Sequence, residues 1–121
     1  MSLTCDSARV AAALSAGVVT ASGAPPRVTR GWPKTFEALP CLAVSEASNR
    51  VASWRDDGDY IQEIETDIRV FAVRADEIDA LARQVESVMT RLDYRRALTY
   101  DSDADAKGGV RMKVMRYRVF I

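Results

Sequence analysis

The sequence contains no histidine among its 121 residues. This absence removes the commonest general base and the commonest metal ligand, along with every Ser–His or Cys–His nucleophile. The two cysteines, Cys5 and Cys41, are far apart and form no CxxC pair, so they indicate neither a disulfide framework nor a zinc site. We therefore expect reduced thiols, with Cys41 buried and unreactive, no metal or cofactor, and no enzymatic activity.

The sequence also lacks an excess of charge and a long apolar run. Lysine and arginine number 17 and the acids number 17, so the net charge is zero. Domains that bind nucleic acid or membrane surfaces normally carry a basic excess, and we expect neither a membrane partner nor sequence-specific nucleic-acid binding. The apolar stretch Val10 to Val19 is too short and too rich in alanine to span a membrane. We expect synthesis in a reducing cytoplasm.

The residues that are present indicate one folded domain over residues 1–121. Hydrophobic residues make up 48% and charged residues 28% of the chain, which is typical of a globular domain of this length. The segment Ile61 to Val73 alternates apolar and charged residues, which predicts an antiparallel strand with one buried and one solvated face. The buried face would carry Ile64, Thr66, Ile68, Val70 and Ala72, and the solvated face Glu63, Glu65, Asp67 and Arg69.

A helix is predicted directly after this strand, capped by Asp76 and running to about Leu92. Its apolar residues recur at helical spacing and form one stripe, which we expect to pack on the apolar face of the preceding strand. The stripe consists of Ile78, Leu81, Ala82, Val85, Val88, Met89 and Leu92.

The first half of the chain predicts shorter elements. A helix is expected over Ser7 to Ala16, capped by Asp6 or Thr4. The segment Val18 to Pro33 is rich in proline and glycine and predicts a loop with a short extended piece around Val28.

The apolar run Leu39 to Val44 predicts a strand. The polar stretch Ser45 to Tyr60, which carries Trp54, predicts a long connection or a loose hairpin tip.

At the C-terminal end, Leu98 to Tyr100 predict the start of a strand, Asp101 to Gly109 a hairpin connection, and Val110 to Ile121 a closing strand. The alternation of the closing strand changes phase, which predicts a bulge or strong twist near Val114. These elements together predict an α+β two-layer sandwich, in which an antiparallel or mixed sheet carries a long helix and a short N-terminal helix on one face.

Three groups of polar residues are candidates for chemistry or binding. Asp101, Asp103 and Asp105 have the spacing of the first ligands of a calcium loop, but Ala106 replaces the required glycine and Met112 the bidentate glutamate, so a solvated hairpin tip is favoured.

The acids of the alternating strand and the arginines of the closing strand form two stripes of opposite charge. They predict cross-strand ion pairs or, alternatively, lateral pairing between subunits. Two tryptophans in irregular segments, Trp32 and Trp54, favour a binding interface.

The order and pattern of the segments Leu39 to Val44, Tyr60 to Leu92 and Val110 to Ile121 resemble the small tail-completion and tail-terminator proteins of long-tailed bacteriophages and prophages. The resemblance implies a homo-hexameric ring in the virion, at the head–tail junction, which caps the tail tube and docks on the head connector. It also implies that Ser45 to Tyr60 and Asp101 to Gly109 are mobile loops that order on contact.

The interface residues expected on this basis lie in the two predicted loops and on the charged outer face of the sheet. They are Trp54, Arg55, Asp56, Asp57, Glu63, Glu65, Asp67, Arg69, Asp101, Asp103, Asp105, Arg116 and Arg118.

Two alternatives remain open at the level of sequence. One is a head-closure or minor capsid component of the phage neck. The other is a dimeric, ferredoxin-like regulatory module that binds a small ligand. The second predicts a glycine-marked pocket at a strand–helix junction, and the junction Val73 to Asp76 contains no glycine.

Overall fold

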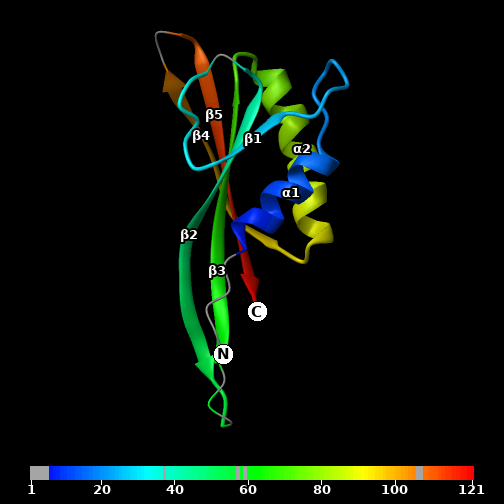
Figure 1. Cartoon of the computed structure of the whole chain (residues 1–121). Coiled ribbons are helices and arrows are strands. Elements are labelled where there is room, and N and C mark those ends of the chain that lie inside the picture. The colour runs from blue at the N-terminus through cyan, green and yellow to red at the C-terminus, as the bar shows by residue number, and fades with distance from the viewer. Residues whose placement is uncertain (1–5, 37, 57, 59, 106–107) are drawn as a thin grey trace.

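A computed structural model describes residues 6–36, 38–56, 58, 60–105 and 108–121. The described residues form two helices and five strands (Figure 1). In chain order they are α1 (Ser7–Gly17), β1 (Arg27–Arg30), β2 (Cys41–Trp54), β3 (Tyr60–Ala72), α2 (Ala75–Arg91), β4 (Arg95–Asp105) and β5 (Val110–Phe120). The sequence predictions made for Thr4, Cys5, Asp57 and Ala106 lie outside the described residues.

The five strands form one mixed sheet in the order β1-β2-β3-β5-β4. β1 runs parallel to β2, and the other neighbouring pairs are antiparallel. Both helices lie on the same side of the sheet (Figure 1). The predicted α+β sandwich is therefore confirmed, with the short extended piece around Val28 as its parallel edge strand.

Both helices form where the sequence predicts them, but the cap predicted for α2 is wrong, and the cap predicted for α1 is correct in position only. The N-cap of α2 is Arg74, and Asp76 lies in the first turn, where its carboxylate accepts hydrogen bonds from Arg74 and from the Glu77 N–H. Asp6 occupies the N-cap of α1 but makes no capping hydrogen bond, because its carboxylate is engaged elsewhere.

The main core lies between the helices and the sheet. The α2 stripe packs against the apolar face of β3, as predicted, and α1 adds Val10 and Leu14. The residues of β3 on this face are Ile68, Val70 and Ala72, each fully buried. The α2 residues are Ile78, Leu81, Ala82, Val85, Val88 and Met89.

The opposite face of the sheet is not uniformly solvated, which corrects the sequence prediction. A second apolar cluster lies there, and the partly buried Phe36 and Leu39 pack against it from the segment before β2. Phe36 and Trp32 both contact the Phe71 ring, with ring centroids 5.3 Å and 5.4 Å apart. The cluster consists of Cys41, Ala43, Phe71, Val110, Met112 and Val114.

This second cluster also explains the change of phase in β5. β5 pairs with β3 without a register shift, so the bulge predicted near Val114 is absent. Val114 belongs to the second cluster, whereas the next residue, Met115, belongs to the main core, as does Tyr117. The strand is regular, and its two halves bury opposite faces because different segments cover the sheet along its length.

Two segments predicted as loops are strands. β2 continues to Trp54, and its residues pair with β3 as far as Tyr60, with register shifts between Glu46 and Ser48 and between Val51 and Ser53. β4 continues to Asp105, with a register shift between Asp103 and Asp105. Neither segment shows a regular apolar alternation, because neither is covered by a helix.

The far end of the β2–β3 hairpin extends beyond both helices (Figure 1). We call residues 50–54 of β2 and 60–63 of β3 the arm. In the arm, β2 is exposed throughout. The C-terminal end of the chain pairs with the base of the arm at Gln62 and Glu63, which are buried. Beyond this point the arm is a two-stranded hairpin, which alone would be at best marginally stable in water, so it depends on the sheet from which it extends.

Candidate subunit interface

The outer face of the sheet, opposite the helices, carries a network of ion pairs between β3 and β5. Asp67 lies opposite Arg116 and Glu65 opposite Arg118 in the β3–β5 register. Arg116 donates two hydrogen bonds to the Asp67 carboxylate, at 2.8 Å and 3.0 Å. The prediction of cross-strand ion pairs is confirmed.

The network continues to the base of the arm through Glu63. This carboxylate accepts two hydrogen bonds from Arg50 of β2, at 3.1 Å and 2.8 Å, and lies 3.0 Å from the Arg118 Nε. Arg118 also donates a hydrogen bond of 3.0 Å to Glu65. The hydrogen bonds from Arg50 hold the pKa of Glu63 below its ordinary value, because they favour the charged carboxylate.

The acids and the arginines of this network differ in exposure. The side chains of Asp67 and Glu63 are 5% and 9% exposed, whereas those of Arg118 and Arg50 are 43% and 64% exposed. The acids are therefore used within the chain, and the arginines present their free edges to solvent. Lateral pairing between subunits remains a prediction for this face.

Arg69 extends the network toward the segment that covers the second cluster. Its guanidinium donates a 2.9 Å hydrogen bond to Ser45 and lies 5.5 Å from the centre of the Trp32 ring. Trp32 therefore rests on Arg69 and Phe71, although just over half of its surface is exposed.

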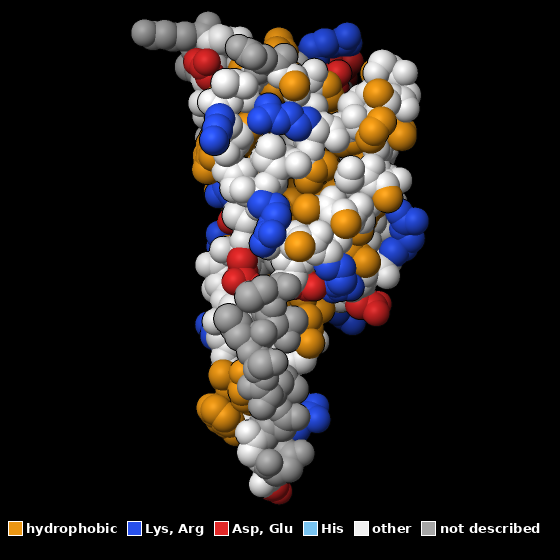
Figure 2. Space-filling model, viewed as in Figure 1, with side chains coloured by type: hydrophobic (Ala, Val, Ile, Leu, Met, Phe, Trp, Pro, Cys, Tyr) orange, Lys and Arg blue, Asp and Glu red, His pale blue; other side chains and the backbone are white. Residues whose placement is uncertain are grey.

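Trp54 behaves differently from Trp32. It ends β2 in the arm, is 69% exposed and contacts Tyr60 edge-on at 5.2 Å between ring centroids. Val51 adds exposed apolar surface on the same face of the arm, and a small group of hydrophobic side chains is visible at the narrow end of the molecule (Figure 2). Arg55 and Asp56 follow Trp54 and are exposed. Exposed apolar groups gathered in this way are typical of interaction surfaces.

The three aspartates of β4 lie on an exposed strand and not at a hairpin tip. Asp101 pairs with Lys113 of β5 at 3.0 Å, Asp103 lies opposite Arg111, and Asp105 follows a register shift. This arrangement does not form a calcium loop. Within the described residues, no group of three His, Cys, Asp or Glu side chains could hold a metal ion.

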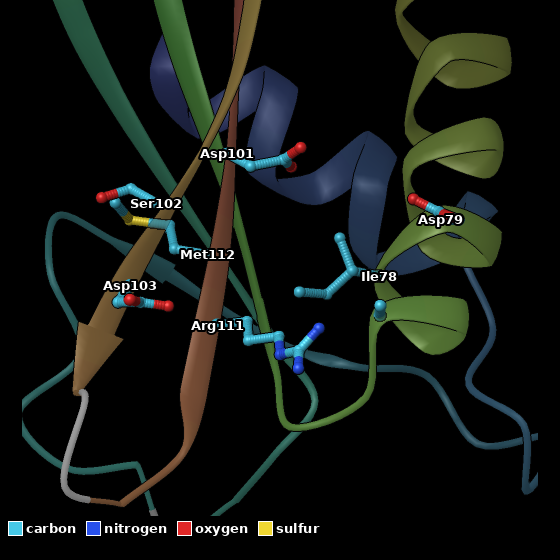
Figure 3. Close-up of a pocket in the computed structure, with 8 residues that line it drawn as sticks. Ile78, Asp79, Asp101, Ser102, Asp103, Arg111 and Met112 are labelled. Carbon is cyan, nitrogen blue, oxygen red and sulfur yellow. The ribbon is translucent and has the colours of Figure 1, made fainter.

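A hollow of about 510 Å³ lies between the start of α2 and strands β4 and β5 (Figure 3). Ile78 and Asp79 line it from α2, and Asp101, Asp103 and Arg111 line it from the strands. The hollow exists because α2 covers β3 and β5 but leaves β4 exposed along most of its length.

A buried polar cluster joins the start of α1 to the start of β4. Asp6 is 6% exposed and accepts hydrogen bonds of 2.7 Å and 2.8 Å from Arg9 and one from the Tyr94 hydroxyl. The hydrogen bonds from Arg9 hold the pKa of Asp6 below its ordinary value. Burial raises the pKa of Tyr94. The sequence gives no signal for a contact between residues 88 positions apart, and this cluster was not predicted.

The structure tests the prediction made for Cys41. Cys41 is fully buried, as predicted, and burial raises the pKa of its thiol, which disfavours the reactive thiolate. None of the described helices is long and apolar enough to cross a membrane.

Comparison with known proteins gives a match in structure but none in sequence. No protein-family model matches the sequence, and no curated protein matches it. Among solved structures, the chain is similar to a chain of the virion of a native gene transfer agent particle, with 16% sequence identity and a TM-score of 0.58. The match covers 92% of this chain and 82% of that chain. At this identity the likeness shows a shared fold.

Proposed function

We propose that the protein is a structural component of a phage-type virion and that it acts without a chemical step. The observation that carries this proposal is the fold shared with a chain of a gene transfer agent virion, over nearly the whole length of both chains. The likeness of segment order and pattern to phage tail-completion and tail-terminator proteins points to the same class.

Within that class, we propose the tail-terminator role. Copies of the chain form a ring, taken to be a hexamer, at the head–tail junction. The ring caps the tail tube and docks on the head connector. Such a ring needs a subunit with a different contact surface on each side, because a head-to-tail contact closes only if complementary surfaces meet around the axis.

The arm supplies one surface of this kind. It extends past the helices, exposes Trp54 and Val51, and carries Arg55 and Asp56 at its end. An exposed tryptophan flanked by charged groups is the kind of residue that dominates the binding energy of an interface. We assign the arm to contact with a neighbouring copy or with the tail tube.

The outer-face network supports the arm and adds a second contact. The ion pairs that link Arg50, Glu63 and Arg118 tie β2 to β3 and β5 at the base of the arm. The exposed edges of Arg118 and Arg116 then offer hydrogen-bond donors to an acidic surface of the adjacent subunit or partner.

The test uses purified protein and tail tubes assembled from a phage-type tail-tube protein. Electron microscopy of the mixture should show one ring at a single end of each tube and tubes of limited length. Trp54→Ala should reduce the number of capped tubes severalfold. Protein that leaves the tube ends bare would contradict the tail-terminator role. Binding to the isolated head connector but not to tubes would instead support a head-closure role.

A further inference from the structure

A hollow of about 490 Å³ opens at the end of the sheet where β4 begins and β5 ends. Its apolar lining comes from Ala97, Val119 and Phe120, and more than half of the Phe120 surface is exposed. The charged residues that line it are Asp93, Arg95, Arg96 and Arg118. Because three arginines and one acid surround its apolar side chains, we call it the basic hollow.

The arginines of the basic hollow are only partly neutralised within the chain. Arg118 pairs with Glu63 and Glu65, but neither Arg95 nor Arg96 forms a salt bridge with another described residue. Arg95 also lies directly opposite Arg118 in the β4–β5 register. Like charges directly opposite each other are destabilising, and a negative group bound between them would relieve the repulsion. The basic hollow therefore favours a partner that brings both an acidic and an apolar group.

The end of the arm carries groups of this kind. Trp54 is 69% exposed at the end of β2, and Asp56 is exposed two residues later. Asp56 forms no salt bridge with another described residue. In the sequence, the connection 55–59 contains three acids and one arginine, so its net charge is −2. An exposed tryptophan beside acids complements the basic hollow, because an indole ring stacks on arginine and a carboxylate pairs with it.

A subunit cannot place its arm in its own basic hollow. The arm consists of β2 and β3, and β5 separates these strands from β4. The arm also extends beyond the C-terminal end of β5 (Figure 1). Glu63 lies level with Phe120, and Trp54 pairs with Tyr60, three residues further along β3. At the usual rise of a strand, Trp54 lies ~10 Å beyond the row of Phe120. The arm therefore reaches the basic hollow of a second copy whose strands are shifted or inclined by about this distance.

We propose that the arm of each copy binds the basic hollow of a second copy, with Trp54 inserted beside Phe120 and Asp56 paired with Arg95. This inference rests on the proposed function and deepens it, because it names the neighbouring copy, and not the tail tube, as the partner of the arm. The contact joins two different surfaces, so it is head-to-tail and closes into a ring when the rotation between neighbours divides a full turn. Its electrostatic part weakens as salt screens the exposed charges.

Charge reversal on the two sides of the contact tests it with the full chain. Arg95→Glu places an acid in the basic hollow, and Asp56→Arg places a base on the arm. Light scattering on a size-exclusion column at low salt should show an oligomer for the wild type and its loss for each variant alone. An equal mixture of the two variants should regain the oligomer, because copies that alternate around a ring place a base opposite an acid at every contact.

The matched control is Arg27→Glu. Arg27 is exposed at the start of β1 and lies level with Phe71, at the end of β3 away from the arm. This variant should assemble like the wild type, and circular dichroism should show all variants folded. Oligomers of wild-type mass in either single variant, no recovery on mixing, or a wild type that stays monomeric would overturn the arm contact. An equal loss in Arg27→Glu would overturn it too, because association would then follow net charge alone.

The capping of tail tubes separates this contact from the proposed function. Variants of the arm that assemble like the wild type but leave tube ends bare would overturn the contact between copies and assign the arm to the tube. Variants that assemble like the wild type and still cap tubes would overturn the contact and leave the proposed function intact. Loss of both assembly and capping in each single variant, with recovery of both on mixing, is the result expected.

Discussion

The two halves of the β2–β3 hairpin show how the same pair of strands serves two purposes. In the first half, Cys41 to Val44 are at most 2% exposed because α1, α2 and the segment containing Phe36 cover both faces. In the arm, β2 has no covering layer, and Trp54 is 69% exposed. The hydrogen-bonded ladder runs through both halves. Burial therefore stabilises the first half. The arm is held by the backbone hydrogen bonds between β2 and β3, and its β2 side chains remain exposed for contact.

We expect the largest loss of stability from a substitution in the covered half. Ile68→Ala removes a fully buried side chain beneath α2, and we expect a loss of about 2–5 kcal/mol in the free energy of unfolding, from lost burial and the cavity left behind. Urea denaturation followed by circular dichroism measures it. The matched change in the arm, Val51→Ala, should alter this free energy by no more than about 0.5 kcal/mol. Equal losses at both positions would show that the arm has a covered face.

A smaller effect is expected where the two halves join. Asp67 is 4% exposed and accepts both hydrogen bonds from Arg116. Asp67→Ala should destabilise the fold by about 1–3 kcal/mol, because it leaves a partly buried guanidinium without its partner. Denaturation at neutral pH tests this. The double variant Asp67→Ala/Arg116→Ala should recover part of the loss, and a fully additive double variant would show that the two groups are not coupled.

The pH dependence of stability should report two buried acids with lowered pKa values, Asp6 beside α1 and Glu63 at the base of the arm. The pKa of Asp6 lies below its ordinary 3.8 and that of Glu63 below 4.5. A carboxylate with a lowered pKa in the folded state contributes stability that is complete above its unfolded pKa and is lost as the pH falls through the folded pKa. Unfolding measured from pH 6 to pH 2 should show this loss beginning below about 4.5. Asp6→Asn should flatten the profile more than Glu63→Gln, because Asp6 is held in the body of the fold.

The smallest effect on stability is expected at the exposed tryptophan. Trp54→Ala should change the free energy of unfolding by no more than about 0.5 kcal/mol, because the side chain is mostly solvated. Its effect should instead appear as weaker assembly or tube binding. Trp32→Ala is the control, since Trp32 packs on Phe71 and its loss should cost stability without altering assembly. If Trp54→Ala lowered stability and Trp32→Ala weakened assembly, the assignment of the interface to Trp54 would be wrong.

The elements that the sequence predicts best are those whose burial is periodic. The stripe of α2 follows from its one covered face and is found where predicted. β3 is also found where its alternation predicts it, although its second face is largely buried and not solvated. The outer half of β2 and the end of β4 were predicted as loops, because strands without a covering layer need no apolar alternation. The phase change of β5 was attributed to a bulge, because a second cluster on the far face, built by Phe36 and Leu39, has no local signature.

The candidate interface could be predicted from the sequence only in part, because some of its contacts likewise have no local sequence signature. Opposite charges on β3 and β5 predicted the ion pairs once the strands were neighbours, and the register confirms them. The contact between Asp6 and Tyr94 depends on how α1 docks against the sheet.

The mass of the wild-type chain in solution tests the central claim most directly. Light scattering on a size-exclusion column, across a range of protein and salt concentrations, should show a hexamer or a concentration-dependent increase toward one, with weaker association at high salt. A tight dimer whose mass does not change with concentration would contradict the ring and favour a ligand-binding regulatory module. A chain that remains monomeric at every concentration would contradict self-assembly through its own arm.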